Sequence, residues 1–302
     1  MAAPAVVALF GPTGVGKTAV AVALARVLRG RGEDPVAISA DALQVYRGLA
    51  TLTGAASAAE RGELDHRLLG FVPVTETFSA GDFAARAHAE IDTALADGRR
   101  PIVVGGTGLY LRAALTDLDL APPPPPGLRE RIEADLDARG AAALHAELAA
   151  AAPGRAAAIE PADRSRIVRA LELHAMGEAA RPPRPVSQLW TGETRHPTLL
   201  AGLVMERAAL YAAIDARVEA IVAAGAVDEV RAAAAAGASR TARAAVGFEE
   251  LMAGDVEGMK RRTRQYAKRQ LTWMRKLAGV RTIDVTGRAA GDVAAEIAAL
   301  IA

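Results

Sequence analysis

Hydrophobic positions in the first hundred residues come in short unbroken runs, separated by segments with helical spacing. Strands are expected at Ala5–Phe10, Val36–Ser39, Arg67–Val74 and Pro101–Val104, and helices at Thr18–Leu28 and Ala80–Ala96. Short apolar runs that alternate with helices are typical of βαβ units, in which helices cover both faces of a parallel sheet. The pattern therefore predicts an α/β fold.

The alternation stops at Pro122–Pro126, five consecutive prolines that cannot form a helix or an inner strand. A second proline-rich marker is Arg181–Pro185, and Gly127–Glu178 between the two is helical in composition. Afterwards, strands are expected at Thr198–Met205 and Val280–Val285, and helices at Glu206–Ala236 (interrupted at Gly225) and Ala289–Ile301. We expect a core domain of residues 1–121 and 186–302, and a small all-helical insertion domain at 122–185.

Composition narrows the class of protein. Of the 302 residues, 51% are hydrophobic and 24% charged, which is typical of an ordered domain. The absence of cysteine excludes disulfides, a cysteine-ligated zinc site and a thiol nucleophile. We expect no membrane segment, because no apolar run is long enough to span a bilayer. The N-terminus lacks the basic region of a signal peptide, which favours a cytoplasmic protein.

The segment after the first strand carries a phosphate-binding pattern. Residues 11–18 match GxxxxGK[ST] between a predicted strand and a predicted helix. Its glycines let backbone N–H groups turn inward, Lys17 adds a positive charge, and the Thr18 hydroxyl is a ligand for Mg²⁺. The predicted diphosphate-binding residues are Gly11, Pro12, Thr13, Gly14, Val15, Gly16, Lys17 and Thr18. The motif leaves open which molecule carries the diphosphate.

Two further strand ends are expected beside this loop, because ligands bind at the carboxyl ends of parallel strands. Asp41 follows the second strand, where it acts either as the cap of the next helix or as a base that faces the phosphates. The fourth strand ends in Gly105–Gly108. P-loop motors and GTPases carry a metal-holding aspartate at such a strand end. Its absence argues against an ordinary ATPase.

A basic block lies near the C-terminus of a chain whose net charge is only +1. Lys260–Lys276 contains eight basic residues and no acidic one, which is typical of a surface that binds a polyanion. A helical projection places Tyr266 and Trp273 on an apolar arc, which we expect to face the core. The basic face is expected to bind phosphates through Arg264, Lys268 and Arg275, the alternative being a solvated helix surface.

Several segments together resemble one family, the tRNA dimethylallyltransferases (tRNA isopentenyltransferases). They are Gly11–Thr18, Asp41–Tyr46, Asp65–His66, Phe78–Ala80 with Phe83, Pro101–Leu111, Asp163–Glu172, Thr241–Glu250 and Gln265–Trp273. The phosphate-binding loop alone is unspecific, whereas the combination in this order is specific. The chain departs from the family at Leu49–Ser57, which lacks the usual lysine and proline, and at Glu249, where a lysine is usual.

The resemblance implies a P-loop NTPase-like parallel sheet flanked by helices, and a transfer reaction. In that family dimethylallyl diphosphate, not ATP, occupies the loop, and N6 of an adenosine next to the tRNA anticodon attacks the prenyl carbon. The implied catalytic residues are Asp41 as base, Thr107 beside the leaving oxygen, and Lys17 on the diphosphate. Thr107 has an alternative role as the cap of the helix that begins at Leu109. His66 is expected to be a structural histidine.

The resemblance also implies contacts with the tRNA anticodon stem-loop, and we expect a monomer. The implied contacts are Asp41, Ala42, Leu43, Gln44, Thr107, Arg129, Ser165, Arg166, Ile167, Val168 and Arg169. Gln44 is expected to bind the edge of the flipped base, and the insertion domain to clamp the stem-loop. Two alternatives stay open, a P-loop small-molecule kinase that uses ATP and a nucleic-acid-binding ATPase.

Overall fold

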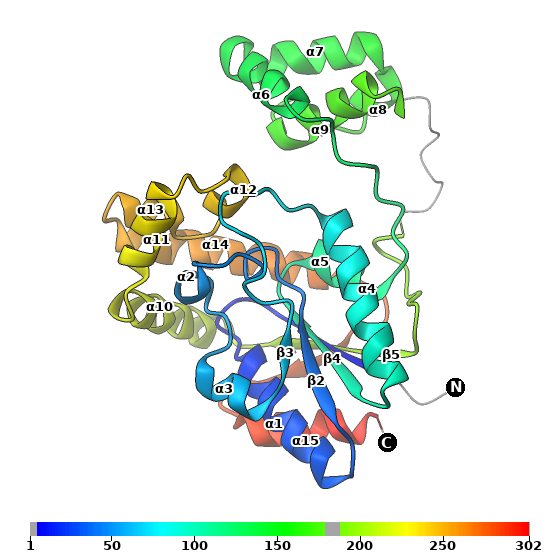
Figure 1. Ribbon diagram of the computed structural model, residues 1–302, viewed down its shortest axis with the longest axis vertical. Coiled ribbons are helices and arrows are strands. Elements are labelled where there is room, and N and C mark those ends of the chain that lie inside the picture. The colour runs from blue at the N-terminus through cyan, green and yellow to red at the C-terminus, as the bar shows by residue number, and fades with distance from the viewer. Residues whose placement is uncertain (1–4, 179–187, 302) are drawn as a thin grey trace. The chain divides into compact units, whose positions relative to one another are not determined.

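The computed structural model describes residues 5–178 and 188–301, and its centre is a six-stranded parallel sheet (Figure 1). The strands are β1 Val6–Phe10, β2 Pro35–Ser39, β3 His66–Arg67, β4 Arg100–Gly105, β5 Thr198–Val204 and β6 Arg281–Asp284. They are arranged in the order β3-β2-β4-β1-β5-β6. The predicted α/β class is confirmed, since β1, β2 and β5 consist almost entirely of buried apolar residues, as strands covered on both faces require.

Helices cover both faces of the sheet (Figure 1). On one face, Val7 and Leu9 of β1 pack with residues of α1 (Lys17–Gly30) and α15 (Ala290–Ala299) in a single apolar cluster. On the other face lie α4 (Ala80–Ala96) and α5 (Gly108–Leu115), which pack against each other and against the strands. The ring of Phe83 on α4 lies 4.4 Å from that of Tyr110 on α5.

Three neighbouring strands end at the same edge of the sheet. The pairings Ser39 with Val104 and Phe10 with Gly105 place the carboxyl ends of β2, β4 and β1 side by side. The phosphate-binding loop follows β1, Asp41 follows β2 and Thr107 follows β4. The register of the sheet therefore brings the three predicted catalytic segments together.

The third strand is much shorter than expected. Instead of Arg67–Val74, only His66–Arg67 pairs with β2. Leu68 has a φ of 61°, a left-handed conformation that interrupts an extended strand. Val72 lies outside the six strands and forms an isolated parallel bridge with Tyr46, which is also outside them.

The C-terminal part of the core supplies a group of helices beside the strand ends. They are α10 Arg207–Ala223, α11 Ala226–Ala235, α12 Arg240–Arg243, α13 Phe248–Met252 and α14 Val256–Met274, accompanied by the short α2 Ala50–Thr53 and α3 Ala58–Glu63. The predicted interruption at Gly225 is confirmed, because its φ of 94° ends one helix and begins the next. The long helix α14 packs against α10 and α13.

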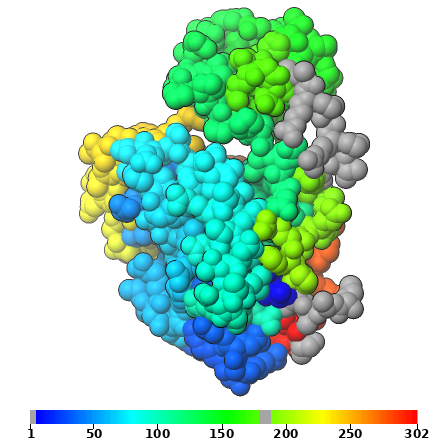
Figure 2. All heavy atoms as spheres, turned by 45° about the vertical axis from the view of Figure 1, so that its right-hand side comes forward, coloured from blue at the N-terminus to red at the C-terminus, as the bar shows by residue number. Residues whose placement is uncertain are grey.

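The chain divides into two compact units, residues 1–118 with 188–302 and residues 119–187, whereas the expected boundaries were 121 and 186. The second unit contains α6 Leu128–Arg139, α7 Ala141–Ala151, α8 Pro153–Ala156 and α9 Arg164–Ala175. Leu136, Leu144, Leu148 and Ile167 form its own apolar core between α6, α7 and α9, and the space-filling view shows the unit as a dense group of atoms (Figure 2). The predicted marker Arg181–Pro185 lies outside the described residues. Within the described ranges no helix is both long and apolar enough to cross a membrane.

We predict that Gly105→Ala destabilises the sheet at this edge. A Cβ atom on Gly105 would lie 2.2 Å from the backbone oxygen of Ala40, so β2 and β4 would have to move apart. Such overpacking lowers the free energy of unfolding by about 1–3 kcal/mol, which urea denaturation can measure. The control is Gly62→Ala in α3, where a Cβ meets no atom within 4 Å and alanine stabilises by about 0.5–1 kcal/mol. Equal changes in the free energy of unfolding for the two substitutions would contradict the close contact between Gly105 and Ala40.

Candidate functional site

A cavity of about 420 Å³ lies at the edge where β2, β4 and β1 end. Residues of the phosphate-binding loop, of the segment after β2, and of α2, α10 and α14 line it. Leu52, Val218 and Met259 give part of the wall an apolar surface, while Lys17, Asp41 and Arg217 bring charges to it. The cavity thus combines a charged part with an apolar part.

The phosphate-binding loop has the conformation that its glycines permit. Gly14 and Gly16 have φ values of 84° and 88°, which a residue with a Cβ rarely adopts. A Cβ atom on Gly14 would also lie 2.9 Å from the side chain of Ile214. Helix α1 begins at Lys17, directly after the loop, so its N-terminal N–H groups and the positive end of its dipole lie at the cavity.

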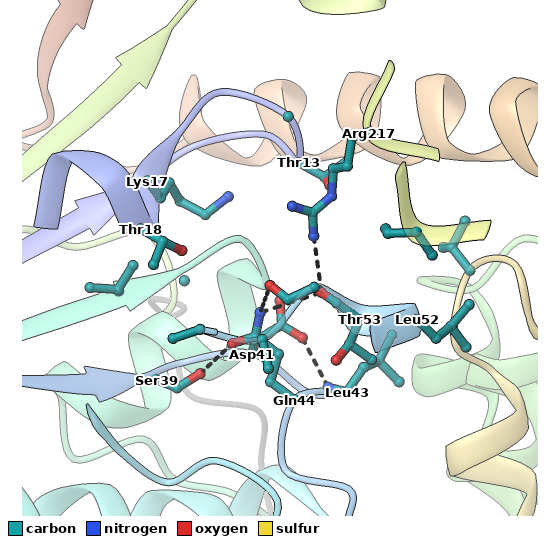
Figure 3. Close-up of a pocket in the computed structure, with 18 of the residues that line it drawn as sticks. Thr13, Lys17, Thr18, Ser39, Asp41, Leu43, Gln44, Leu52, Thr53 and Arg217 are labelled. Carbon is teal, nitrogen blue, oxygen red and sulfur yellow. Dashed lines mark hydrogen bonds between the residues drawn. The ribbon is translucent and has the colours of Figure 1, made fainter. Parts of the chain in front are cut away.

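Lys17 is half-buried and points into the cavity beside Thr18 (Figure 3). Its Nζ donates to the backbone oxygens of Gly11 at 3.0 Å and Pro12 at 2.9 Å, so it is held over its own loop. Burial lowers the pKa of Lys17 to about 8; the negative charge of Asp41 opposes this shift, whereas the positive charge of Arg217 adds to it. An anion bound in the cavity would stabilise the charged form of Lys17.

Asp41 holds the turn that follows β2 and also lines the cavity, while its role as a base stays a prediction. Its Oδ1 accepts a hydrogen bond from the backbone N–H of Leu43 at 2.9 Å, as a capping carboxylate does. Residues 42–45 form a turn rather than a helix, and the carboxylate also lines the cavity together with Lys17 and Arg217 (Figure 3). The turn fixes one carboxylate oxygen and leaves the carboxylate facing the cavity.

Gln44 also lines the cavity, but its amide is hydrogen-bonded within the protein. Its Oε1 accepts from the Ser39 hydroxyl at 2.9 Å, and its Nε2 donates to the backbone oxygens of Thr53 at 3.4 Å and Gly54 at 3.3 Å. Gln44 therefore connects β2 to the end of α2, and its predicted contact with a base stays a prediction. His66 donates from Nδ1 to the backbone oxygen of Leu64 at 2.6 Å, and it also lines the cavity, so its expected structural role stays a prediction.

Thr107 occupies the N-cap position of α5, which begins at Gly108 rather than at Leu109, but its hydroxyl makes no capping bond. Instead, Oγ1 accepts from the backbone N–H of Ala42 at 3.4 Å and lies 3.3 Å from the Tyr266 hydroxyl. The alternative role as a helix cap was therefore wrong. The hydroxyl joins the loop after β4 to the loop after β2 and to α14.

Arg217 on α10 is a charged residue of the cavity that the sequence analysis missed. It points into the same space as Lys17 and Asp41, and it donates to the backbone oxygen of Thr53 at 3.1 Å (Figure 3). Burial lowers the pKa of Arg217, and the charge of Asp41 opposes this shift. Among the described residues, no carboxylate lies within ion-pair distance of its guanidinium. A guanidinium that has no carboxylate partner among the described residues is suited to a phosphate.

Helix α14 also contributes Gln270, which the sequence did not predict either. The buried amide accepts from the backbone N–H of Thr13 at 2.8 Å and donates to the backbone oxygen of Gly106 at 2.8 Å. It thereby joins the phosphate-binding loop to the loop after β4. Tyr266 on the same helix was expected in the core, but it is only half-buried and lines the cavity. Trp273 packs on Trp190, with 4.7 Å between the ring centroids.

The basic block is less uniform than its sequence suggests. Although Lys260–Lys276 contains no acidic residue, its first cations do have acidic partners, because α10, the segment around α13 and the first turn of α14 bring carboxylates to them. The pairs are Lys260 with Glu219 and Glu257, Arg261 with Asp255, Arg262 with Glu250, and Arg264 with Asp215. Within the described chain, no carboxylate pairs with the four later residues, Lys268, Arg269, Arg275 and Lys276. The free positive charge is therefore concentrated at the C-terminal end of α14.

In the insertion, two of the predicted RNA contacts hold the unit together. Arg129 and Arg169 both pair with the carboxylate of Glu172, whose side chain is fully buried. Burial alone would raise the pKa of Glu172, but the two arginines lower it overall. Arg169 also donates to the backbone oxygens of Ala121 and Pro122, which fixes the start of the proline segment to α9.

The other predicted contacts on α9 differ in exposure. Ser165 and Arg166 are exposed, and Arg166 makes one ion pair, to Asp163 at 3.3 Å. The side chains of Ile167 and Val168 are buried in the core of the unit. The side chains at these two positions are therefore turned away from solvent, and the implied contact with RNA there stays a prediction. Helical periodicity turns them toward α6 and α7.

The site fits a magnesium ion that is bound together with a diphosphate. The Thr18 hydroxyl and the Asp41 carboxylate, both hard oxygen ligands, line the cavity. The described residues contain no group of three or more acidic, histidine or cysteine side chains that could hold a metal by themselves. Mg²⁺ normally takes few protein ligands and completes its shell with phosphate oxygens and water. This donor set matches that preference.

The fold and the site define a P-loop protein, in which a parallel sheet presents a phosphate-binding loop at a strand end. The profile of the family described as IPP transferase matches residues 44–277. The tRNA dimethylallyltransferase of Anaeromyxobacter dehalogenans is 45% identical over 285 residues, covering 91% of this chain and 93% of the relative. That of Symbiobacterium thermophilum is 39% identical over 304 residues, covering 96% and 92%. The chain therefore belongs to the tRNA dimethylallyltransferase family.

Solved structures agree with this assignment. The full-length tRNA isopentenylpyrophosphate transferase of Bacillus halodurans superimposes with a TM-score of 0.69 at 32% identity, covering 98% of this chain and 96% of the other. A eukaryotic dimethylallyltransferase shares the fold at 23% identity, with a TM-score of 0.74, covering 98% of this chain and 77% of the other. The predicted family and the P-loop fold class are confirmed.

We predict that binding of inorganic diphosphate takes up a proton at alkaline pH. Because the pKa of free Lys17 is about 8, the side chain is mostly neutral at pH 9 and mostly charged at pH 7. A bound anion raises this pKa, so affinity falls as the pH rises above 8. Calorimetry at pH 9, in magnesium-containing buffers with different ionisation enthalpies, should count about one more proton for the wild type than for Lys17→Met. At pH 7 the wild type and Lys17→Met should take up nearly the same number of protons. An equal difference between them at both pH values would contradict a lowered pKa of Lys17.

Proposed function

We propose that this protein transfers the dimethylallyl group of dimethylallyl diphosphate to N6 of an adenosine next to the anticodon of tRNA, releasing diphosphate. One observation carries the proposal: a single cavity holds Lys17 and Arg217, two cations that form no ion pair with a carboxylate of the described residues, together with Asp41 and an apolar wall. The cations suit a diphosphate, the wall suits a short prenyl chain, and the carboxylate suits a proton acceptor. Relatives named tRNA dimethylallyltransferase support the same reaction.

The phosphate-binding loop, Lys17 and Arg217 would hold the diphosphate. As the bond between C1 of the prenyl group and its oxygen breaks, negative charge accumulates on the diphosphate, and fixed positive groups stabilise that charge. Thr18 would help to hold a Mg²⁺ ion, whose positive charge would offset part of the same negative charge. Desolvation strengthens these interactions, because the cations lie in a cavity rather than in open solvent.

Asp41 would act on the nucleophile. The N6 amine of adenine forms a bond to C1 while the C1–oxygen bond breaks, and the extra proton on nitrogen passes to the Asp41 carboxylate. The turn that holds Oδ1 through Leu43 keeps the carboxylate in place for this step. The target base must leave the stacked anticodon loop to reach the cavity, as in other enzymes that act on a base.

The free end of the basic block would contact the RNA backbone. Lys268 on α14 and Arg275 directly after it are exposed and carry charge that no carboxylate of the described chain neutralises. Arg264 is paired with Asp215 at 2.8 Å, so an RNA phosphate would have to compete for its guanidinium. The exposed Ser165 and Arg166 of the insertion would add contacts from the second unit.

The reaction is expected in the cytoplasm, with the protein acting as a monomer.

The direct test incubates the purified protein with labelled dimethylallyl diphosphate and unmodified tRNA, and follows transfer of label to RNA. A second reaction replaces the prenyl donor with labelled ATP. Label on tRNA from the prenyl donor alone supports the proposal. Transfer from ATP to a small molecule would support a kinase, and ATP hydrolysis stimulated by nucleic acid would support an ATPase.

We predict that Asp41→Asn nearly abolishes transfer but leaves tRNA affinity within about twofold. The amide keeps the shape and can still accept from Leu43, but it cannot accept a proton; loss of a general base costs about 10²–10⁴-fold in rate. Single-turnover rates and filter binding measure the two effects separately. Unchanged kcat with an unchanged pH–rate profile would reduce Asp41 to a structural cap.

We also predict that the two halves of the basic block differ in their effect on salt dependence. Replacing Lys268 and Arg275 with glutamine should reduce the slope of log Kd for tRNA against log salt by about 0.7–0.9 per lost contact. The matched control replaces Lys260 and Arg261, which already have carboxylate partners. This control should change the slope much less. Equal changes in both pairs would show that ion pairing within the protein does not select the RNA-binding residues.

A further inference from the structure

Tyr266 brings a hydroxyl group to the reaction cavity, and the mechanism above does not use it. The residue lies on α14, lines the cavity, and carries the guanidinium of Arg269 over its ring at 5.6 Å from the centroid. Its phenol oxygen lies 3.3 Å from Oγ1 of Thr107. The ring is thus held between a cation and the loop that follows β4.

The hydroxyl groups of Tyr266 and Thr107 together have one hydrogen that they can donate to a ligand. Each hydroxyl has one hydrogen and two lone pairs, and the two groups share one hydrogen in the bond between them. The backbone N–H of Ala42, at 3.4 Å, can only donate, so it occupies one lone pair of Thr107 Oγ1. One hydroxyl hydrogen of the pair therefore stays available, and the direction of the bond between Tyr266 and Thr107 decides which residue keeps it.

Acidity decides this direction. A phenol is a stronger acid than an aliphatic alcohol, so it is the better donor and the poorer acceptor. When Tyr266 donates, both lone pairs of Thr107 Oγ1 are occupied, one by the phenol and one by the Ala42 N–H. The hydrogen of Thr107 is then the free one. It lies on the loop after β4, between the Asp41 turn and the phosphate-binding loop to which Gln270 joins it.

We propose that Tyr266 is a positioning residue, which donates to Thr107 and so reserves the Thr107 hydrogen for an oxygen of the bound prenyl diphosphate. This inference rests on the proposed function. No covalent step passes through the phenol, since it only fixes the orientation of its neighbour. Burial and the negative charge of Asp41 raise the pKa of Tyr266 to about 12, so the phenol keeps its proton over the working pH range.

The test is a double-mutant cycle on single-turnover transfer with saturating dimethylallyl diphosphate and tRNA. Tyr266→Phe keeps the ring and removes the donor; losing one neutral hydrogen bond should lower the rate about 3- to 10-fold. Thr107→Val removes the reserved hydrogen and should cost about 10²-fold. The double variant should be no slower than Thr107→Val, because Tyr266 acts only through Thr107. The dissociation constants for tRNA and inorganic diphosphate should stay within twofold in Tyr266→Phe.

The matched control is Tyr211→Phe on the neighbouring α10. Its ring is also held by arginines, and no described residue forms a hydrogen bond with its hydroxyl. Its rate should equal that of the wild type. Effects of Tyr266→Phe and Thr107→Val that multiply in the double variant would overturn the proposal, as would a Tyr266→Phe rate equal to that of Tyr211→Phe. A wild-type protein that transfers no prenyl group would instead refute the proposed function.

Discussion

Parallel pairing of β2, β4 and β1 is the constraint on which the site depends. Because the three strands are neighbours and run in one direction, their carboxyl ends meet at one edge. The loops that follow them carry Lys17, Asp41 and Thr107. The close approach of Gly105 to Ala40 is part of the same constraint, since a side chain there would separate β2 from β4. The same pairing of strands therefore determines both the stability of the sheet and the geometry of the site.

Positive charge in the cavity destabilises the protein when no ligand is bound, because the cations are partly removed from water. Burial lowers the pKa values of Lys17 and Arg217, and the backbone carbonyls of the loop and of α2 are their hydrogen-bond acceptors. Asp41 offsets only part of this cost. A diphosphate supplies the missing negative charge, so binding and stabilisation of the leaving group use the same two cations. This arrangement suits a reaction in which charge appears on the diphosphate, because the donors are in place before the bond breaks.

Helix α14 connects this chemistry to the surface. Gln270 and Tyr266 face inward, where they touch both loops of the site. The exposed side of the helix carries basic residues, neutralised near its start by α10 and the segment around α13 and left free near its end. A polyanion bound at the free end would contact the same rigid element that positions Thr107. In the helical insertion, by contrast, Arg129 and Arg169 are not left free for a ligand. Both form ion pairs with the buried Glu172 and stabilise the fold of that unit.

The sequence by itself determined the βαβ pattern, the phosphate-binding loop, the carboxylate and hydroxyl after β2 and β4, and the family, because these follow from short-range spacing. Only the tertiary structure decided that Arg217 enters the cavity, that Tyr266 lines it, and that Gln270 joins two loops. Helical periodicity gives the face on which a residue lies, but not the element that this face meets. The partners of Arg217 and Gln270 lie more than a hundred positions away along the chain. Charge pairing on α14 escaped the sequence for the same reason, since carboxylates from other helices neutralise cations that a local count leaves unpaired.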